Sequence, residues 1–301
     1  MPFLEKLLAG TPTLSFELFP PKNPAGWGTL YSTLGEISKL SPDYISVTYG
    51  AGGSTRIKTV ELVARIQGEL GIESMAHLTC VGHSKDEIRD ILQLLEKSGI
   101  RNVLALRGDP PKGDKFFKPH PDGFAHATDL IKFIRGQFAL QIGCAFYPEK
   151  HMEAESLEKD LEYLKQKQQL GAQFTISQMF FDNEVFYRFR DKAASMGILI
   201  PMVAGIMPVL DLNQLTRFKE LSDCAIPEKM VAFISQGRPE DVINRGVEMA
   251  TQQCDELLKN GIAGIHLFSL NRSHSSARIT ENLRKLGHFP IPAPAGTSPK
   301  P

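Results

Sequence analysis

Short apolar segments typical of β-strands alternate with longer segments typical of helices along almost the whole chain of 301 residues. There are eight strand candidates, and several of the helical segments between them end at a glycine, as at Leu70-Gly71 and Leu170-Gly171. Eight strand–helix units in one chain of this length predict a (β/α)8 (TIM) barrel in the α/β class. The predicted strands are Thr13–Phe19, Asp43–Tyr49, Glu73–Cys80, Asn102–Arg107, Leu140–Tyr147, Gln173–Phe180, Leu199–Met207 and Gly264–Phe268, and the predicted helices include Gly26–Leu40, Thr55–Leu70, Ser84–Ser98, Glu153–Leu170 and Asn183–Met196.

Further features of the sequence refine this prediction of a barrel. The stretch between the seventh and eighth strands is long enough for about two extra helices, roughly over Pro227–Asn260. No linker marks a second domain, so we predict one domain over residues 1–288 and a Pro-rich tail, residues 289–301, that we expect to be disordered. A doubly wound sheet is the alternative fold, but the GxGxxG motif typical of its nucleotide site does not occur in the sequence.

Composition excludes several classes of partner. The formal net charge is zero, which favours neither nucleic acid nor an anionic membrane surface. No apolar run approaches the roughly 20 residues that span a bilayer, and the first residues, MPFLEKLLAG, lack the pattern of a signal peptide. Four widely spaced cysteines without a CxxC pair indicate reduced thiols. We therefore expect a cytoplasmic protein.

Polar residues stand at the ends of six predicted strands, where a barrel of this kind places its functional groups. In the stretch LSFELFPPK, apolar residues that would pack on helices alternate with a second set that contains Glu17. Glu17 is therefore expected to project into the top of the barrel, where a carboxyl group shielded from water suits a general acid. The polar residues expected at the same rim include Thr48, His77, Arg107, Asp109, Tyr147, Gln178 and Arg272.

Each of these residues also has a simpler structural interpretation. Glu17 could form a buried ion pair with Arg107 without any chemistry, and His77 alone is most simply a hydrogen-bonded core histidine. Glu153 is most simply part of a solvated helix face. The spacing of His77, Cys80 and His83 resembles a metal site, but a strand would point His77 and Cys80 to opposite faces, so we predict no metal.

Eight motifs in a fixed order resemble those of the methylenetetrahydrofolate reductase family. They are FELFPPK, SVTYGAGGST, AHLTC, LALRGD, AFYPEKH, SQMFFDN, GIMPV and HLFSLNR, and they extend over about residues 13–287. The resemblance implies a (β/α)8 barrel that binds FAD and reduces 5,10-methylenetetrahydrofolate to 5-methyltetrahydrofolate with NADH or NADPH. We expect ping-pong kinetics and a homo-oligomer, and a product that feeds methionine biosynthesis or one-carbon energy metabolism.

The resemblance also assigns roles to individual positions. Glu17 matches the general acid that helps to protonate the folate and open its ring, and Asp109 matches a carboxylate placed to stabilise the resulting cation. Gln178 matches a residue that contacts folate and nicotinamide in turn. Other substrate-binding positions fall on Gln214, Phe218 and Arg272, and FAD-binding positions fall on Thr48, Tyr49, Ala51, His77, Arg107, Gly108, Asp109, Ala127, Tyr147, His151, Ala154, Asp160 and Lys167.

The chain departs from the family pattern where adenine-side contacts of FAD are expected. Tyr163 and Gln166 replace polar or basic residues that touch the cofactor in some members. Two other functions fit the sequence less well. An aldolase would need a lysine at a strand end, which the predicted strands lack, and a non-catalytic binding protein would not need both Glu17 and Asp109. Some larger members carry a domain that binds S-adenosylmethionine, and we expect that control to be absent here.

Overall fold

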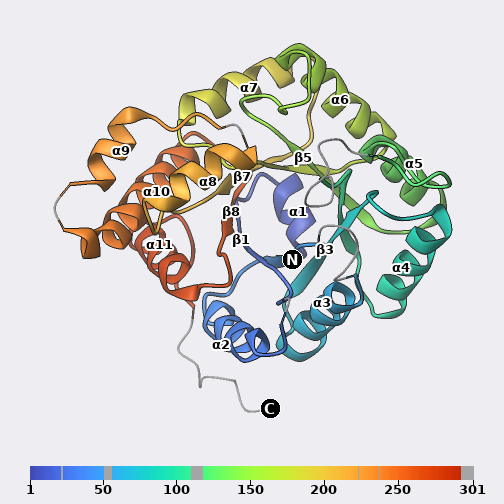
Figure 1. The fold of residues 1–301 in the computed structure, drawn as a ribbon, viewed down its shortest axis with the longest axis horizontal. Helices are drawn as coiled ribbons and strands as arrows, with labels where there is room; N and C mark the ends of the chain where they lie inside the picture. The colour runs from blue at the N-terminus through green and yellow to red at the C-terminus, as the bar shows by residue number, and fades with distance from the viewer. Residues whose placement is uncertain (22, 51–55, 110–117, 223, 237, 293–301) are drawn as a thin grey trace.

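The computed structural model describes residues 1–21, 23–50, 56–109, 118–222, 224–236 and 238–292. Its parallel strands pair in sequence order and close into a barrel in which β8 lies beside β1, so the predicted (β/α)8 fold is confirmed. Figure 1 shows the helices arranged around the strands. The strands are β1 (Thr13–Leu18), β2 (Tyr44–Val47), β3 (Glu73–Thr79), β4 (Asn102–Leu106), β5 (Gln141–Phe146), β6 (Phe174–Ser177), β7 (Met202–Ile206) and β8 (Gly264–Phe268).

The helices agree with the predicted pattern, including the insertion between β7 and β8, which contains α8, α9 and α10. Several predicted boundaries are wrong: β6 ends at Ser177 rather than at Phe180, β7 begins at Met202 rather than at Leu199, and α6 begins at Leu157 rather than at Glu153. The start of α6 is set by the Ser156 hydroxyl, which caps the helix by accepting a hydrogen bond from the Lys159 N–H. The helices are α1 (Phe3–Leu8), α2 (Gly26–Ser38), α3 (Arg56–Leu70), α4 (Lys85–Lys97), α5 (Ala127–Gln137), α6 (Leu157–Leu170), α7 (Asn183–Ser195), α8 (Asn213–Ser222), α9 (Glu228–Ile234), α10 (Val242–Lys259) and α11 (Ser273–Lys285).

Alternate residues of each strand face opposite sides of the barrel wall. Phe16 of β1 and Ile45 of β2 point outward and are fully buried in the main apolar core beneath the helices. Ser15 and Ser46, their neighbours in sequence, point inward, where both hydroxyls lie within hydrogen-bonding distance of the His266 ring. This alternation is the one predicted for the stretch around Glu17.

Helix α1 closes the end of the barrel where the strands begin. Its residues Phe3, Leu4 and Leu7 form a second apolar cluster with inward side chains near the strand starts, among them Tyr44 and Phe174. Figure 1 shows α1 at the centre of the ring of helices. The sequence did not predict this helix. Because α1 fills this end with apolar side chains, a ligand can enter the barrel only at the carboxyl ends of the strands.

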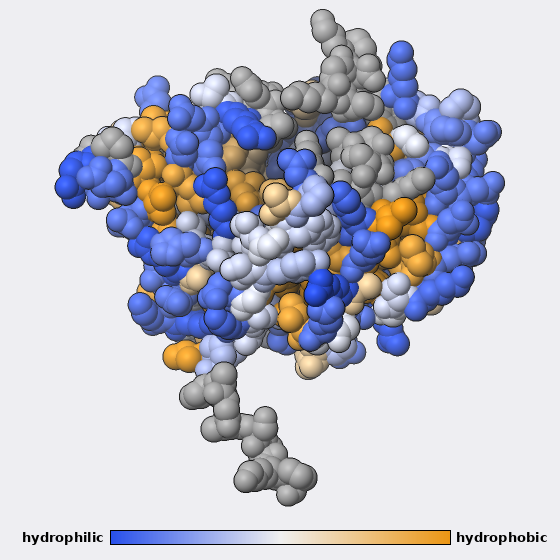
Figure 2. Space-filling model, turned by 60° about the horizontal axis from the view of Figure 1, so that its bottom comes forward, coloured by the Kyte–Doolittle hydropathy of each residue, from blue (hydrophilic) through white to orange (hydrophobic). Residues whose placement is uncertain are grey.

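Several smaller predictions can be compared with the structure. All four cysteines are buried and free, as predicted. On the face in Figure 2, hydrophilic residues separate the apolar ones into patches. No helix among the described residues is long and apolar enough to cross a bilayer. Phe289, where we placed the start of the tail, packs into the main core, whereas residues 293–301 lie outside the described part of the chain.

Candidate active site

A cavity of about 480 Å³ opens at the carboxyl ends of the strands. Its walls come from strands on both sides of the barrel, from the first turn of α5 and from one face of α6. This end of the barrel is the usual place for an active site in this fold. Twelve of the predicted site residues line it: Glu17, His77, Arg107, Gly108, Asp109, Ala127, Tyr147, His151, Ala154, Asp160, Lys167 and Gln178.

The Glu17 carboxylate lies between two histidine rings. Its Oε2 atom is 3.6 Å from Nε2 of His77 and 3.8 Å from Nε2 of His266, and 21% of its side chain is exposed. The strand register fixes this position, since Glu17 is paired with Ser46 on one side and Phe268 on the other. The carboxyl group is therefore sheltered but open to a ligand in the cavity, which a general acid requires.

His77 is neutral at pH 7. Burial lowers its pKa to about 4, against a smaller opposing effect of the Glu17 carboxylate. Its Nε2 atom is buried and has no hydrogen-bond partner among the described residues. Buried polar atoms are normally satisfied, so an unpartnered nitrogen on a cavity wall is available to a ligand.

A group of cationic and hydrogen-bonding side chains lines another part of the cavity. The Arg107 guanidinium makes two parallel contacts to the Glu153 carboxylate, one of them 2.9 Å between Nη2 and Oε1. This pairing raises the pKa of Arg107 and lowers that of Glu153. Glu153 is thus not part of a solvated helix face, and Arg107 binds this carboxylate where the structural interpretation suggested Glu17.

Hydrogen bonds within the chain fix the positions of two neighbouring residues, Lys167 and His151. Lys167 Nζ donates to the Ala145 carbonyl oxygen at 2.9 Å, and the His151 backbone N–H donates to Asp160 Oδ2 at 2.8 Å. Burial, followed by the charge of Arg107, lowers the pKa of His151. The His151 ring is therefore a neutral donor or acceptor beside two permanent cations.

Gly108 directs the two charged residues beside it into the cavity. Its φ of 86° lies in the left-handed region, and a Cβ atom there would be 2.8 Å from Val81 Cγ1 and 2.9 Å from Thr79 Cβ. Glycine is therefore the residue that fits this turn without strain. Arg107 and Asp109, on either side of Gly108, both line the cavity.

Comparisons with known proteins agree with this geometry. A family model for methylenetetrahydrofolate reductase matches residues 3–284. The chain belongs to the methylenetetrahydrofolate reductase family. It is 36% identical to the 5,10-methylenetetrahydrofolate reductase of Escherichia coli (strain K12), with 91% of each chain covered. It is also 36% identical to methylenetetrahydrofolate reductase (NADH) 1 of Arabidopsis thaliana, and it spans about half the length of the plant relatives it matches, covering 91% of this chain and 48% of that one.

Solved structures of low sequence identity share the barrel. One is a protein from Clostridium thermocellum described as binding two copies of 5-methyl-5,6,7,8-tetrahydrofolic acid, with a TM-score of 0.63 and 16% identity over 94% of this chain and 98% of that one. Another is oxaloacetate acetylhydrolase, with a TM-score of 0.52 and 12% identity over 99% of this chain and 89% of that one. These likenesses concern the fold alone.

Some positions that the family resemblance assigned do not line the cavity. The Tyr49 hydroxyl lies 2.9 Å from His83 Nε2, and the Gln214 side chain accepts a hydrogen bond from the Leu210 N–H. Phe218 is 3% exposed and stacks on Phe181 within the apolar cluster of the insertion between β7 and β8. Thr48 and Arg272 also lie outside the cavity lining, and Ala51 lies outside the described residues. The ligand contacts of these six positions stay predictions.

Other cavity residues escaped the sequence analysis. His266 is the clearest, because a histidine at an inward position of an otherwise apolar strand was a visible signal. His126 precedes α5, and its chemistry gave no pattern of its own in the sequence. No cluster of three or more His, Cys, Asp or Glu side chains suited to a metal ion occurs within the described ranges. Tyr163, Gln166 and Glu153, which the sequence analysis named without assigning them to the site, also line the cavity. The other additional lining residues that could contact a ligand are His126, Thr128, Ser177, His266 and Phe268.

Proposed function

We propose that the protein is an FAD-dependent methylenetetrahydrofolate reductase, which reduces 5,10-methylenetetrahydrofolate to 5-methyltetrahydrofolate with NADH or NADPH. The observation that carries this proposal is the sharing of one cavity by a sheltered carboxyl group, Glu17, a second carboxylate, Asp109, and the cations Arg107 and Lys167. An acid and an anion suit a substrate that must be protonated and then pass through a cation, and the cations suit a phosphate-bearing cofactor.

The residues of the cavity fit FAD. Arg107, Lys167 and His151 offer donors to a pyrophosphate without a glycine-rich loop, and the unpartnered Nε2 of His77 offers a further polar contact. Gly108 lines the same cavity and would offer backbone contacts to the flavin ring. FAD bound there would accept hydride from the nicotinamide and pass it to the folate in a ping-pong sequence.

The chain's own groups would handle the proton and the charge. Glu17 would deliver a proton from its carboxyl group to a folate nitrogen, and the neutral ring of His77 lies beside it without adding a positive charge. Asp109, exposed at the rim, would stabilise a cation on the folate through its negative charge. Gln178 lines the same cavity and would orient folate and nicotinamide in turn.

Anaerobic stopped-flow spectroscopy tests this proposal. The purified protein is expected to be yellow, with about one non-covalent FAD per chain, and NADH or NADPH should bleach the flavin absorbance. Addition of 5,10-methylenetetrahydrofolate should then restore the absorbance in a second, separate step. A protein that binds no flavin after reconstitution, or a bleached protein that the folate cannot reoxidise, contradicts the proposal.

The setting of the reaction belongs to the same proposal. We place the enzyme in the cytoplasm as a homo-oligomer whose product feeds one-carbon metabolism, including methionine biosynthesis. The buried free thiols support a reducing compartment. Light scattering coupled to size-exclusion chromatography should give a mass that is a multiple of 33.4 kDa, and a monomer at that mass would exclude the oligomer.

A further inference from the structure

An aromatic side chain of helix α6 faces the cavity and not the solvent side of the helix. Tyr163 lies three residues before Gln166 and four before Lys167, the spacing that places side chains on one helix face. All three line the cavity. Tyr163 is 47% exposed. Among the described residues, no other large exposed apolar side chain lines this cavity. An exposed ring on a cavity wall is a surface for a ligand.

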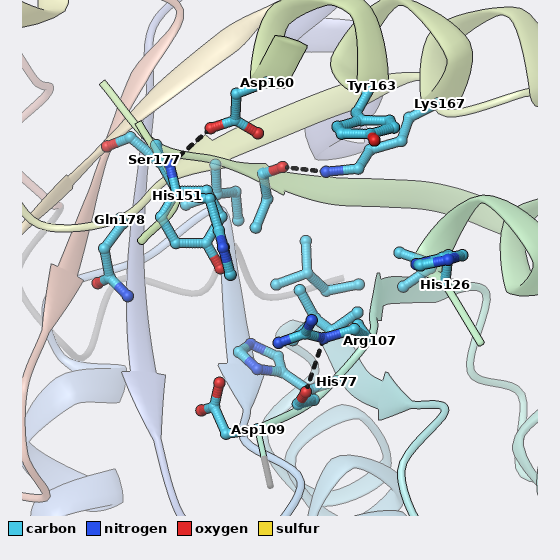
Figure 3. Close-up of a pocket in the computed structure, with 18 of the residues that line it drawn as sticks. His77, Arg107, Asp109, His126, His151, Asp160, Tyr163, Lys167, Ser177 and Gln178 are labelled. Atoms are coloured by element: carbon cyan, nitrogen blue, oxygen red, sulfur yellow. Dashed lines mark hydrogen bonds between the residues drawn. The ribbon is translucent and has the colours of Figure 1, made fainter. Parts of the chain in front are cut away.

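The Tyr163 ring and the residues expected to act in the reaction lie at opposite ends of the cavity. Figure 3 shows Tyr163 and Lys167 together on one side, with His126 on the same side of the cavity. Asp109 and Gln178 lie on the opposite side, and Arg107 projects between the two sides. The reacting groups and the exposed aromatic ring are therefore separated by a cation.

We propose that Tyr163 stacks on the adenine ring of FAD and thereby sets the preference of the site for FAD over FMN. The inference rests on the proposed FAD dependence. The flavin ring has to lie at the end with Glu17 and Asp109, where the proton and the folate cation are handled. The pyrophosphate would then meet Arg107, and the second ring of the dinucleotide would reach the end that holds Tyr163. FMN ends at its phosphate and has no group to place there.

The chemistry next to Tyr163 suits adenine. Gln166 lies on the same helix face, and its amide presents a donor and an acceptor side by side, the pair that matches the N6 and N7 atoms of adenine. The Lys167 amine is engaged by the Ala145 carbonyl oxygen, so its stem lies along the wall beneath the tyrosine. A flat ring and an amide at this end suit a base, and neither group carries the positive charge that favours a phosphate.

Binding measurements on the flavin-free protein test the inference. Dissociation constants for FAD and FMN would be measured by the change of flavin fluorescence for the wild type, Tyr163→Ala and Tyr163→Phe. Base–aromatic stacking predicts that Tyr163→Ala weakens FAD binding about 5- to 150-fold. Its FMN affinity should stay within about twofold, and Tyr163→Phe, which keeps the ring, should bind both like the wild type.

Tyr31→Ala is the matched control, because Tyr31 is also a partly exposed tyrosine on a surface helix but lies outside this cavity. It should change neither affinity, and thermal melts should show that every variant is folded. An unchanged FAD affinity in Tyr163→Ala, or an equal loss for FAD and FMN, overturns the stacking role. Wild-type protein that binds neither flavin refutes the proposed cofactor and the inference together, whereas FAD binding without folate reduction refutes the proposed function alone.

Discussion

The two ends of the barrel are built from the same strands and carry opposite chemistry. At the amino end, helix α1 inserts Phe3 among Tyr44 and Phe174, with ring centroids 4.3 Å and 5.4 Å away. At the carboxyl end, Ser46 of the same strand as Tyr44 points to the same interior, but it lies 3.2 Å from the His266 ring in a polar network. Two residues along one strand therefore separate an apolar plug from the floor of the cavity.

This contrast indicates that folding and chemistry depend on different layers of the barrel. The apolar end gains stability from buried apolar surface, whereas the polar end holds ionisable groups that burial makes costly. Substitutions at one end should therefore leave the property of the other end unchanged. The predictions below test this separation, from the largest effect to the smallest.

Glu17→Gln should give the largest effect on chemistry. The amide keeps the shape of the side chain but cannot act as an acid, and general acid catalysis typically contributes about 10²–10⁴-fold. The single-turnover rate of folate reduction should fall by that order, while bleaching by the nicotinamide and the melting temperature stay close to the wild type. Glu36→Gln, on the exposed face of α2, is the control. A wild-type folate rate would return Glu17 to a structural role.

Phe3→Ala should affect the opposite property. Phe3 is 1% exposed, and truncation of a buried phenylalanine costs about 3–5 kcal/mol of unfolding free energy. Denaturant unfolding should show this loss, while the rate of folate reduction per folded molecule stays unchanged. Leu8→Ala, on the same short helix but 64% exposed, should cost almost nothing. A lower rate in folded Phe3→Ala protein would mean that the plug also shapes the cavity.

His77, a residue of the polar end, should make the stability of the whole protein depend on pH. Its pKa is about 4 in the folded protein and 6.5 ordinarily, so between these values the unfolded chain binds a proton that the folded chain does not. Stability then falls as pH falls, by about 2 kcal/mol for this group at pH 5 relative to pH 7. Urea unfolding at the two pH values should show that His77→Gln loses less unfolding free energy than the wild type between pH 7 and pH 5, by about 2 kcal/mol. The exposed His274→Gln variant should follow the wild type, and parallel curves for His77→Gln would show that burial is not the cause.

The sequence predicted the barrel because each strand and helix is a local pattern. The alternation of apolar residues around Glu17 and the glycine after Leu170 are readable without tertiary information, and the structure places both as expected. Helix α1 was not predicted, because six residues are too few for a helical period to stand out. The start of α6 was displaced, because a single serine cap decided it.

The site residues that could be predicted from the sequence are those at the ends of strands. Residues at strand ends, such as Glu17, His77 and Arg107, line one cavity because parallel strands bring their carboxyl ends to the same rim. Phe218, in the insertion between β7 and β8, is positioned by helix packing, which no local pattern specifies, and it lies in an apolar cluster. His266 shows the reverse case, because it opens the motif HLFSLNR but was given no role, and its strand places it in the cavity.

Glu153→Gln should give the smallest effect, at the outer edge of the polar end. Glu153 now occupies the guanidinium of Arg107, the group expected to bind the cofactor phosphates, so the carboxylate competes with the ligand for the same donors. The Glu153 side chain is half exposed and ion pairs open to solvent are weak, so loss of its charge should tighten FAD binding only about two- to fivefold. The gain should shrink as salt screens the remaining charges. Titration of flavin-free protein at low and high salt measures this, with the exposed neighbour Glu155→Gln as the control. Weaker FAD binding in Glu153→Gln would reverse the assignment, because it would mean that Glu153 holds Arg107 in place for the ligand.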